Sequence, residues 1–339
     1  MKTYLHPYRM LPGGGALVGL LSLLLAAVPA RAQFTDINSL QNTVGNRIEA
    51  ATILGGDFGM TGASYNKGSG GNLTLSKFGG WGDIGDPQPL GTLPIAWQPQ
   101  LQGEMGYLVA TKNYTAADSV TYAGTPYNLQ GAFTRYHDFS IQFGGGPRLW
   151  FNDYFSIAPT FMGMYGHTEN TFDPKGNAFA AANQPLARQL GLVDYTADTW
   201  TIRPAVDFQL VYTWRRTIIT LNSDPVYFHT ESFSTSNPNV SVNGNSETWE
   251  NKIDVDVPLG KELWGHEVRV GGYFSRTEFY GNIQDGLNID HLYEIHGRLV
   301  LDYLNELWKV QWIGIGYSYL WGNGGFTGNS IGLDIAFRF

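Results

Sequence analysis

The last nine residues of this 339-residue chain, 331–339, alternate strictly between apolar side chains and side chains that are small or charged. The apolar set is Ile331, Leu333, Ile335, Phe337 and Phe339. Successive side chains of a β-strand point to opposite faces, so this segment predicts a strand with one apolar and one polar face. A soluble sheet can use such a strand. A transmembrane β-barrel requires it, because one face meets lipid and the other faces a polar lumen.

The composition agrees with a barrel. The chain contains 43 Gly, 19 Tyr, 19 Phe and 10 Trp, but only 15% charged residues, which suits tight turns and aromatic girdles at the membrane surfaces. Beyond residue 32, no stretch approaches the roughly 20 apolar residues that a transmembrane helix needs. We therefore predict an all-β membrane protein. The sequence has no Cys, which excludes disulfides and thiolate metal sites, and nothing in it predicts a metal or a cofactor.

The first 32 residues have the organisation of a secretory signal peptide. Lys2 and Arg9 precede a short apolar run at 16–28, and Ala30-Arg31-Ala32 is a small-residue cleavage site. A membrane-anchoring helix is the alternative, but the apolar run is short for spanning a bilayer. Removal of 1–32 takes the formal charge from −8 to −11, because two Arg and one Lys are lost. The mature chain is therefore strongly acidic, which argues against nucleic acid as a partner.

Twelve segments of the mature chain can be interpreted as strands, and closed bacterial barrels have an even number. They lie near 50–64, 69–79, 93–112, 130–151, 154–169, 197–213, 217–231, 247–258, 266–281, 288–304, 308–321 and 329–339. Tight links are expected at 152–153, 214–216, 259–261 and 305–306, and long links at 113–129, 170–196 and 232–246. Short and long links alternate, as periplasmic turns and extracellular loops do. The pattern does not explain why the link at 80–92 is long.

A charged lumen is the second prediction from the alternation. Within 288–304, apolar residues such as Ile295 and Leu299 share one face and charged residues share the other. A soluble sandwich seldom places so many charges on its core face. The predicted inward-facing network is Glu250, Lys252, Asp254, Asp256, Glu267, Arg269, Asp290, Glu294, His296, Arg298, Asp302, Asp334 and Arg338. If these charges pair across strands, the network stabilises the wall. Alternatively, the excess of acidic residues lines a pathway that favours cations.

Residues 33–48 differ from the barrel segment, 49–339. Phe34, Ile37, Leu40, Val44 and Ile48 recur at helical spacing. One interpretation is a short amphipathic helix beneath the periplasmic mouth, or a frayed terminus. The other is a helix that plugs the lumen, with Arg47 or Glu49 paired to charges of the wall.

These features together resemble a known family. A twelve-stranded antiparallel barrel with an N-terminal helical segment looks like an autotransporter β-domain. The C-terminal third, from Asp290-His291-Leu292-Tyr293-Glu294 through Leu307-Trp308-Lys309-Val310-Gln311-Trp312 to the last strand, is similar to the solitary, passenger-less autotransporter-like barrel family. The resemblance implies the outer membrane of a Gram-negative bacterium, with lipid and lipopolysaccharide as surroundings. The resemblance implies no catalytic activity and no catalytic residues.

The C-terminus also resembles the closing strand of outer-membrane barrels, which typically ends on Phe. This resemblance implies that Ile335, Phe337 and Phe339 form a signal read by the barrel-assembly machinery, after export by the secretion machinery. A closed barrel leaves no strand edge that demands a partner, so a monomer is expected.

An enzymatic site at the extracellular rim is a further hypothesis. His137, Asp138, His167 and His229, with Glu169 and Glu231, fall near the outer ends of three predicted strands. A His oriented by a carboxylate suits general-base chemistry. However, polar residues are expected at any rim, and His137 and Ser140 lack the two-residue spacing of outer-membrane phospholipases. The sequence therefore favours a narrow or gated channel for small solutes, then a non-conducting surface or envelope-structural barrel, then a rim hydrolase.

Overall fold

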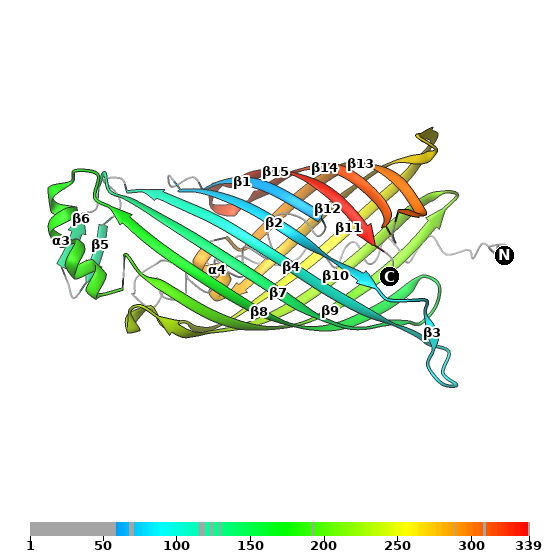
Figure 1. Cartoon of the computed structure of the whole chain (residues 1–339), viewed down its shortest axis with the longest axis horizontal. Helices are drawn as coiled ribbons and strands as arrows, with labels where there is room; N and C mark the ends of the chain where they lie inside the picture. Colours follow the sequence, from blue (N-terminus) through cyan, green and yellow to red (C-terminus); the bar gives the residue numbers. More distant parts are fainter. Residues whose placement is uncertain are drawn as a thin grey trace. The chain divides into compact units, whose positions relative to one another are not determined.

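A computed structural model describes residues 59–67, 71–114, 119–122, 125–128, 130–191, 193–287, 289–307 and 310–337. The predicted signal peptide and the predicted helix at 33–48 lie outside these residues. In the described part, twelve long strands form the wall of a barrel (Figure 1). They are β1 (Gly59–Lys67), β2 (Gly71–Asp83), β4 (Ala96–Asn113), β7 (Phe133–Trp150), β8 (Phe155–Asp173), β9 (Thr196–Trp214), β10 (Thr217–Thr235), β11 (Asn243–Leu263), β12 (His266–Gly281), β13 (His291–Leu307), β14 (Val310–Gly322) and β15 (Phe326–Phe337).

The barrel is closed. Each long strand pairs antiparallel with its neighbours in the chain, β1 pairs with β15, and β2 pairs with β4. This confirms the predicted twelve-stranded antiparallel barrel. Within the described residues, no helix is long and apolar enough to cross a membrane.

The alternation predicted from the sequence defines the two faces of the wall. On β4, Leu101, Met105 and Tyr107 are exposed on the outer surface, whereas Gln100 and Glu104 are buried on the lumen side. Antiparallel neighbours keep the same faces aligned across the ladder, so the apolar outer surface continues around the barrel.

The long link at 80–92 extends the β2–β4 hairpin beyond the wall. β3 (Gln88–Pro89) pairs with β4, and the Ile84 N–H donates to the Pro99 carbonyl at 2.7 Å. The Gln98 side chain also donates to the Gly85 carbonyl at 2.5 Å. This hairpin projects from the end of the barrel opposite α3 (Figure 1). Backbone and side-chain hydrogen bonds thus hold this long link against β4.

Several predicted boundaries were wrong. β11 continues to Leu263, and its turn lies at Trp264-Gly265, not at 259–261. Both turn residues have positive φ, as a type I′ hairpin turn requires. A register shift between Pro258 and Glu262 absorbs the segment around Gly260 that suggested the earlier turn. β13 likewise continues to Leu307, past the turn predicted at 305–306. β1 begins at Gly59; of the segment predicted at 50–64, residues 50–58 are not described.

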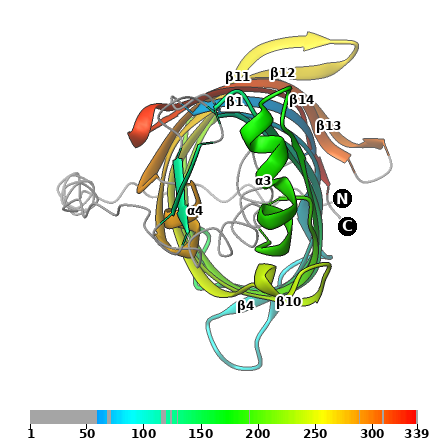
Figure 2. The ribbon, with the colours of Figure 1, turned by 90° about the vertical axis from the view of Figure 1, so that its left-hand side faces the viewer.

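The long links carry the remaining elements and occur at one end of the barrel, here called the outer end. They hold the β5 (Ser119–Tyr122) and β6 (Thr125–Asn128) hairpin, α3 (Ala178–Gln189), η1 (Pro238–Val240), α4 (Asn282–Leu287) and η2 (Asn323–Gly325). Figure 2 shows α3 lying across the mouth of the barrel. Asn177 caps the helix by accepting the Ala180 N–H, and the Asn237 amide donates to the Arg188 and Gln189 carbonyls. The β8–β9 and β10–β11 loops are therefore tied together over the mouth.

Candidate functional site

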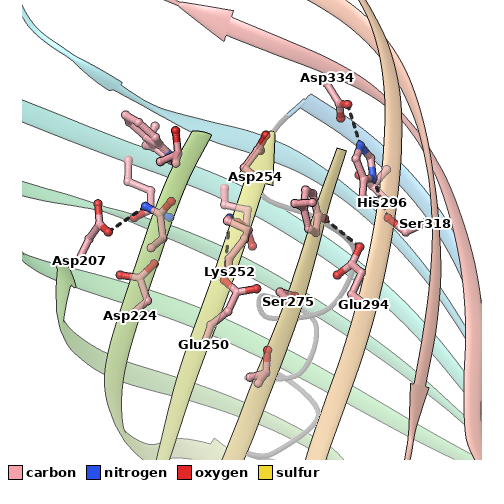
Figure 3. Close-up of a pocket in the computed structure, with 18 of the residues that line it drawn as sticks. Asp207, Asp224, Glu250, Lys252, Asp254, Ser275, Glu294, His296, Ser318 and Asp334 are labelled. Atoms are coloured by element: carbon pink, nitrogen blue, oxygen red, sulfur yellow. Dashed lines mark hydrogen bonds and ion pairs between the residues drawn. The ribbon is translucent and has the colours of Figure 1, made fainter. Parts of the chain in front are cut away.

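The candidate site is the lumen, which encloses a cavity of about 360 Å³ lined by side chains from all twelve barrel strands. Its described lining is acidic, with eight carboxylates against four Lys or Arg side chains (Figure 3). The carboxylates are Glu104, Asp207, Asp224, Glu250, Asp254, Asp256, Glu294 and Asp334. The cations are Lys77, Arg203, Lys252 and Arg298. The wall therefore presents a net negative charge to the cavity.

Arg298 of β13 forms the best-defined ion pair of the lumen. Its two terminal nitrogens each donate to one oxygen of Asp254 on β11, both at 2.8 Å. The intervening strand, β12, places Gly271 under the guanidinium, where a Cβ would lie 2.8 Å from Nε. The missing side chain on β12 thus lets two strands that are not neighbours share a charge pair.

A second pair lies nearer the inner end. Arg269 Nε donates to Asp256 at 2.7 Å, and its Nη1 is 3.9 Å from Asp302. Glu267 instead accepts from Arg216 at 2.5 Å, and the Arg216 side chain is largely exposed. The structure therefore brings together Arg269, Asp256 and Asp302 of the predicted network, but places Glu267 at its margin.

His296 links β13 to β14 and β15. Its Nδ1 lies 2.8 Å from Ser318 Oγ, and its Nε2 lies 3.2 Å from an Asp334 oxygen. The imidazole stacks on Tyr273 at a centroid distance of 4.7 Å, and the Tyr273 hydroxyl donates to Glu294 at 2.8 Å. These contacts orient one carboxylate of the lumen on each side of the His–Tyr stack. Figure 3 shows His296 between Ser318 and Asp334.

Asp224 and Glu250 face each other directly across β10 and β11. Lys252, two residues further along β11, is 4.0 Å from Glu250 and 5.3 Å from the Tyr273 ring centroid. All three side chains line the cavity (Figure 3). The strand register therefore places two carboxylates side by side on the cavity wall.

The sequence interpretation missed the buried network around Arg148 of β7. This guanidinium is 1% exposed and contacts Asp83 at 3.4 Å, Asp207 at 3.2 Å and Gln209 at 2.9 Å. Trp81 and Trp150 lie against it, at 5.1 and 5.8 Å from ring centroid to Cζ. The sequence signal for this network is an Arg at a position of β7 that faces the lumen. Its partners come from strands that are distant in the sequence.

Apolar side chains gather at the outer end of the lumen on the side formed by β1, β2, β4 and β12–β15, whereas buried polar residues such as Asp138 and Thr168 lie at a similar level on β7 and β8. Inward-facing positions that carry charge lower down carry apolar side chains here, and α4 adds Ile283 to them. The buried layer consists of Ala63, Tyr65, Leu75, Leu108, Phe279, Ile283, Ile289, Leu292, Leu320 and Phe326. A second group, Tyr136, Tyr195, Ala197, Val240 and Val242, lies on the opposite wall, and Ala110 packs against both. We call these two groups the outer apolar layer.

The predicted rim cluster of His137, Asp138, His167 and His229 does not form. The three His residues occupy alternate strand positions that face the outer wall, as the exposed side chains Phe139 and Tyr165 do. Asp138, in contrast, is fully buried and accepts a hydrogen bond from Thr168 at 2.6 Å. The histidines also have separate partners: Tyr107 for His137, Asp198 for His167 and Asn245 for His229. Consecutive strand residues point to opposite faces, which separates His137 from Asp138.

The other predicted site residues are dispersed. Asp290 lies before β13 and accepts from the Gln284 and Asn323 side chains near the outer end. Ile335 pairs with Ile313, and Phe337 pairs with Val310 in the β14–β15 ladder. Arg338 and Phe339 lie outside the described residues. Among the described residues, no group of three or more His, Asp or Glu side chains is arranged to hold a metal ion.

Comparison with known proteins follows the architecture. A family model described as a solitary outer membrane autotransporter beta-barrel domain matches residues 92–333. The transport unit of the autotransporter AIDA-I from Escherichia coli superimposes with a TM-score of 0.53 at 12% identity, covering 91% of this chain and 100% of that one. The translocator domain of the autotransporter NalP from Neisseria meningitidis gives 0.50 at 10% identity, covering 87% and 94%. These likenesses concern the fold. No protein of curated function matches the sequence.

Proposed function

Because the chain belongs to the family of solitary outer-membrane autotransporter β-barrel domains, and so forms a barrel in a Gram-negative outer membrane, we propose that it acts as a gated channel for small solutes that favours cations. The observation that carries the proposal is the excess of carboxylates over cationic side chains on the cavity lining. Acidic rings attract cations and repel anions in a narrow pore. The low-dielectric wall strengthens this field inside the lumen.

The outer apolar layer supplies the gate in this proposal. Hydrophobic constrictions block ions because water leaves them. Phe279, Ile283 and Leu320 are each at most 1% exposed, so the layer is packed. Conduction therefore requires that α4 and its neighbours move. Ile283 is the residue to substitute in a test, because it belongs to the short helix α4 and not to a strand of the wall.

The test is single-channel conductance of the refolded mature protein in planar bilayers, comparing wild type with Ile283→Asn and Ile283→Val. The polar amide should hydrate the layer and give larger or more frequent openings than wild type. Ile283→Val keeps the layer apolar and should match wild type. If the wild type and both variants stay silent while fully folded, the channel proposal fails.

Silence would favour the second candidate, a non-conducting surface-interaction or envelope-structural barrel. The packed outer layer and the α3–η1 contacts at the mouth favour it specifically. In that function, the loops at 113–129 and 170–196 would make the contacts. A hydrolase based on His137, His167 and His229 has no comparable support, because these side chains do not converge.

We also propose that residues 33–48 occupy or underlie the lumen. The acidic lining offers partners for Arg47, which supports the plug interpretation. Deletion of residues 33–46 should enlarge the conductance steps if the segment plugs the lumen. Steps of unchanged size in a folded deletion variant would contradict the plug.

A further inference from the structure

A shallow groove of about 610 Å³ lies on the outer wall and crosses strands β14, β15, β1, β2, β4 and β7. Its outward-facing lining side chains are uncharged, and most of them are large, apolar and exposed. They are Met60, Gly62, Ser76, Phe78, Met105, Tyr107, Phe139, Ile315, Ile331 and Leu333. Since this face of the barrel meets lipid, the groove lies open to the membrane.

Small residues on neighbouring strands create the groove. In one cross-strand row, Gly62 and Ser76 sit between Ile331 on one side and Tyr107 on the other. In the next row towards the outer end, Ser64 and Thr74 occupy the same two strands. The depression therefore lies over Gly62 and Ser76, between the bulky Ile331 and Tyr107, and small polar side chains continue along the β1–β2 pair towards the outer end.

The Tyr107 hydroxyl lies at the outer end of the groove, and two cations lie further along β7 towards the outer end of the barrel. The Tyr107 hydroxyl lies 2.6 Å from His137 Nδ1, just above Phe139 on β7. Arg135 follows two residues further along the same outward face, roughly 13 Å from Phe139. Lys175 Nζ lies 4.5 Å, and Arg135 Cζ 5.5 Å, from the centroid of the Phe133 ring, so both cations flank one aromatic side chain.

Carboxylates also border this area. Glu169 faces His137 across the β7–β8 ladder, and Asp173 faces Phe133. Asp173 accepts the Lys175 backbone N–H at 2.9 Å, and Lys175 Nζ donates to the Asn113 side chain at 3.3 Å. The area is therefore a local arrangement of two cations above an apolar groove, and not a broad basic patch.

From this arrangement we propose that the groove binds an acyl chain of lipid A, the phosphorylated glycolipid of the outer leaflet. The chain would lie over Gly62 and Ser76 between the bulky flanks. A phosphate would lie near Arg135 and Lys175. The position of the cations selects the outer leaflet, because an inner-leaflet lipid would place its phosphate at the opposite end of the groove. This inference does not depend on whether the barrel conducts.

Gly62→Leu fills the groove without disturbing the wall. A Cβ at Gly62 has no neighbouring heavy atom within 4 Å. Gly163→Leu is the matched control, because Gly163 of β8 is also exposed and its Cβ would be equally unobstructed, but it lies outside the groove. The double variant Arg135→Gln/Lys175→Gln tests the phosphate contacts separately.

The measurement is native mass spectrometry of the full-length protein extracted from outer membranes in mild detergent. Wild type and Gly163→Leu should retain lipid A, and Gly62→Leu should retain about tenfold less. The Arg135→Gln/Lys175→Gln variant should no longer prefer added lipid A over its dephosphorylated form. The proposal is overturned by equal retention in Gly62→Leu, by a retained phospholipid in place of lipid A, or by a dimer that Gly62→Leu dissociates.

Discussion

At the scale of single residues, the lumen is organised by arginines that bind carboxylates from other strands. Arg298 reaches Asp254 across β12, and Arg148 reaches Asp83 and Asp207 from β7. Each guanidinium is largely buried and holds strands together beyond the reach of the backbone ladder. Such pairs are needed because a charge left alone on this wall is costly.

Arg298→Gln should destabilise the barrel by about 3 kcal/mol, because Asp254 would lose both of its hydrogen bonds beside Asp256. The measurement is urea unfolding in lipid vesicles. The double variant Arg298→Gln/Asp254→Asn should recover much of that loss, since it removes the unpaired charge. Equal stability of Arg298→Gln and wild type would contradict a structural role for the pair.

The sequence predicts these charges only in part. Strict alternation in β13 is enough to identify Glu294, His296 and Arg298 as inward-facing residues. The Arg148 network was not predictable in this way, because Asp83 and Asp207 are 65 and 59 residues away. Their meeting depends on barrel closure and strand register. Register depends on bulges and turns, which local alternation does not determine.

At the scale of elements, α3 is held over the mouth by Asp194. This carboxylate accepts from Arg188 at 2.7 Å, from Gln184 at 2.8 Å and from the Phe172 N–H at 2.9 Å. Partial burial raises the pKa of Asp194, but these hydrogen bonds outweigh it and hold the pKa below its ordinary value of 3.8. The folded loop therefore favours the ionised form.

This lowered pKa predicts that α3 loosens in acid. The stabilisation is complete above the ordinary pKa and is lost as the pH falls through the lower pKa of the folded state. We expect a loss of about 1 kcal/mol, because Arg188 is mostly exposed. Hydrogen exchange of the α3 amides measures it. Asp194→Asn should show the weaker protection already at neutral pH, and protection that does not change with acidification in wild type would contradict the prediction.

Glycines in β7 set how closely its neighbours approach. A Cβ at Gly146 would overlap the Pro159 carbonyl oxygen of β8, whereas a Cβ at Gly163 has nothing within 4 Å. Gly146→Ala should therefore destabilise the barrel by about 2 kcal/mol or more. Gly163→Ala should fold normally. The folded fraction on heat-modifiable gel electrophoresis measures the difference, and equal fractions would show that β7 and β8 adjust freely.

At the scale of the whole molecule, the barrel combines a lipid-facing apolar surface, an acidic lumen and an apolar layer near its outer end. The parity of the strands predicts the first two. It also carried a signal for the third, because Leu75, Leu108 and Leu320 sit at inward-facing positions near the outer ends of their strands. That signal becomes clear only when the strands are aligned with one another. The strand ends must be known before the heights of residues along the barrel axis can be compared between strands.

The reversal potential in a KCl gradient tests the central claim most directly. It is measured in Ile283→Asn, in which the outer apolar layer should be hydrated and the channel open. The account predicts a potential of the sign given by preferred K⁺ passage, which falls towards zero when Asp224→Asn and Glu250→Gln are added. A potential of the opposite sign, or one that these two substitutions leave unchanged, would contradict a cation-favouring lumen.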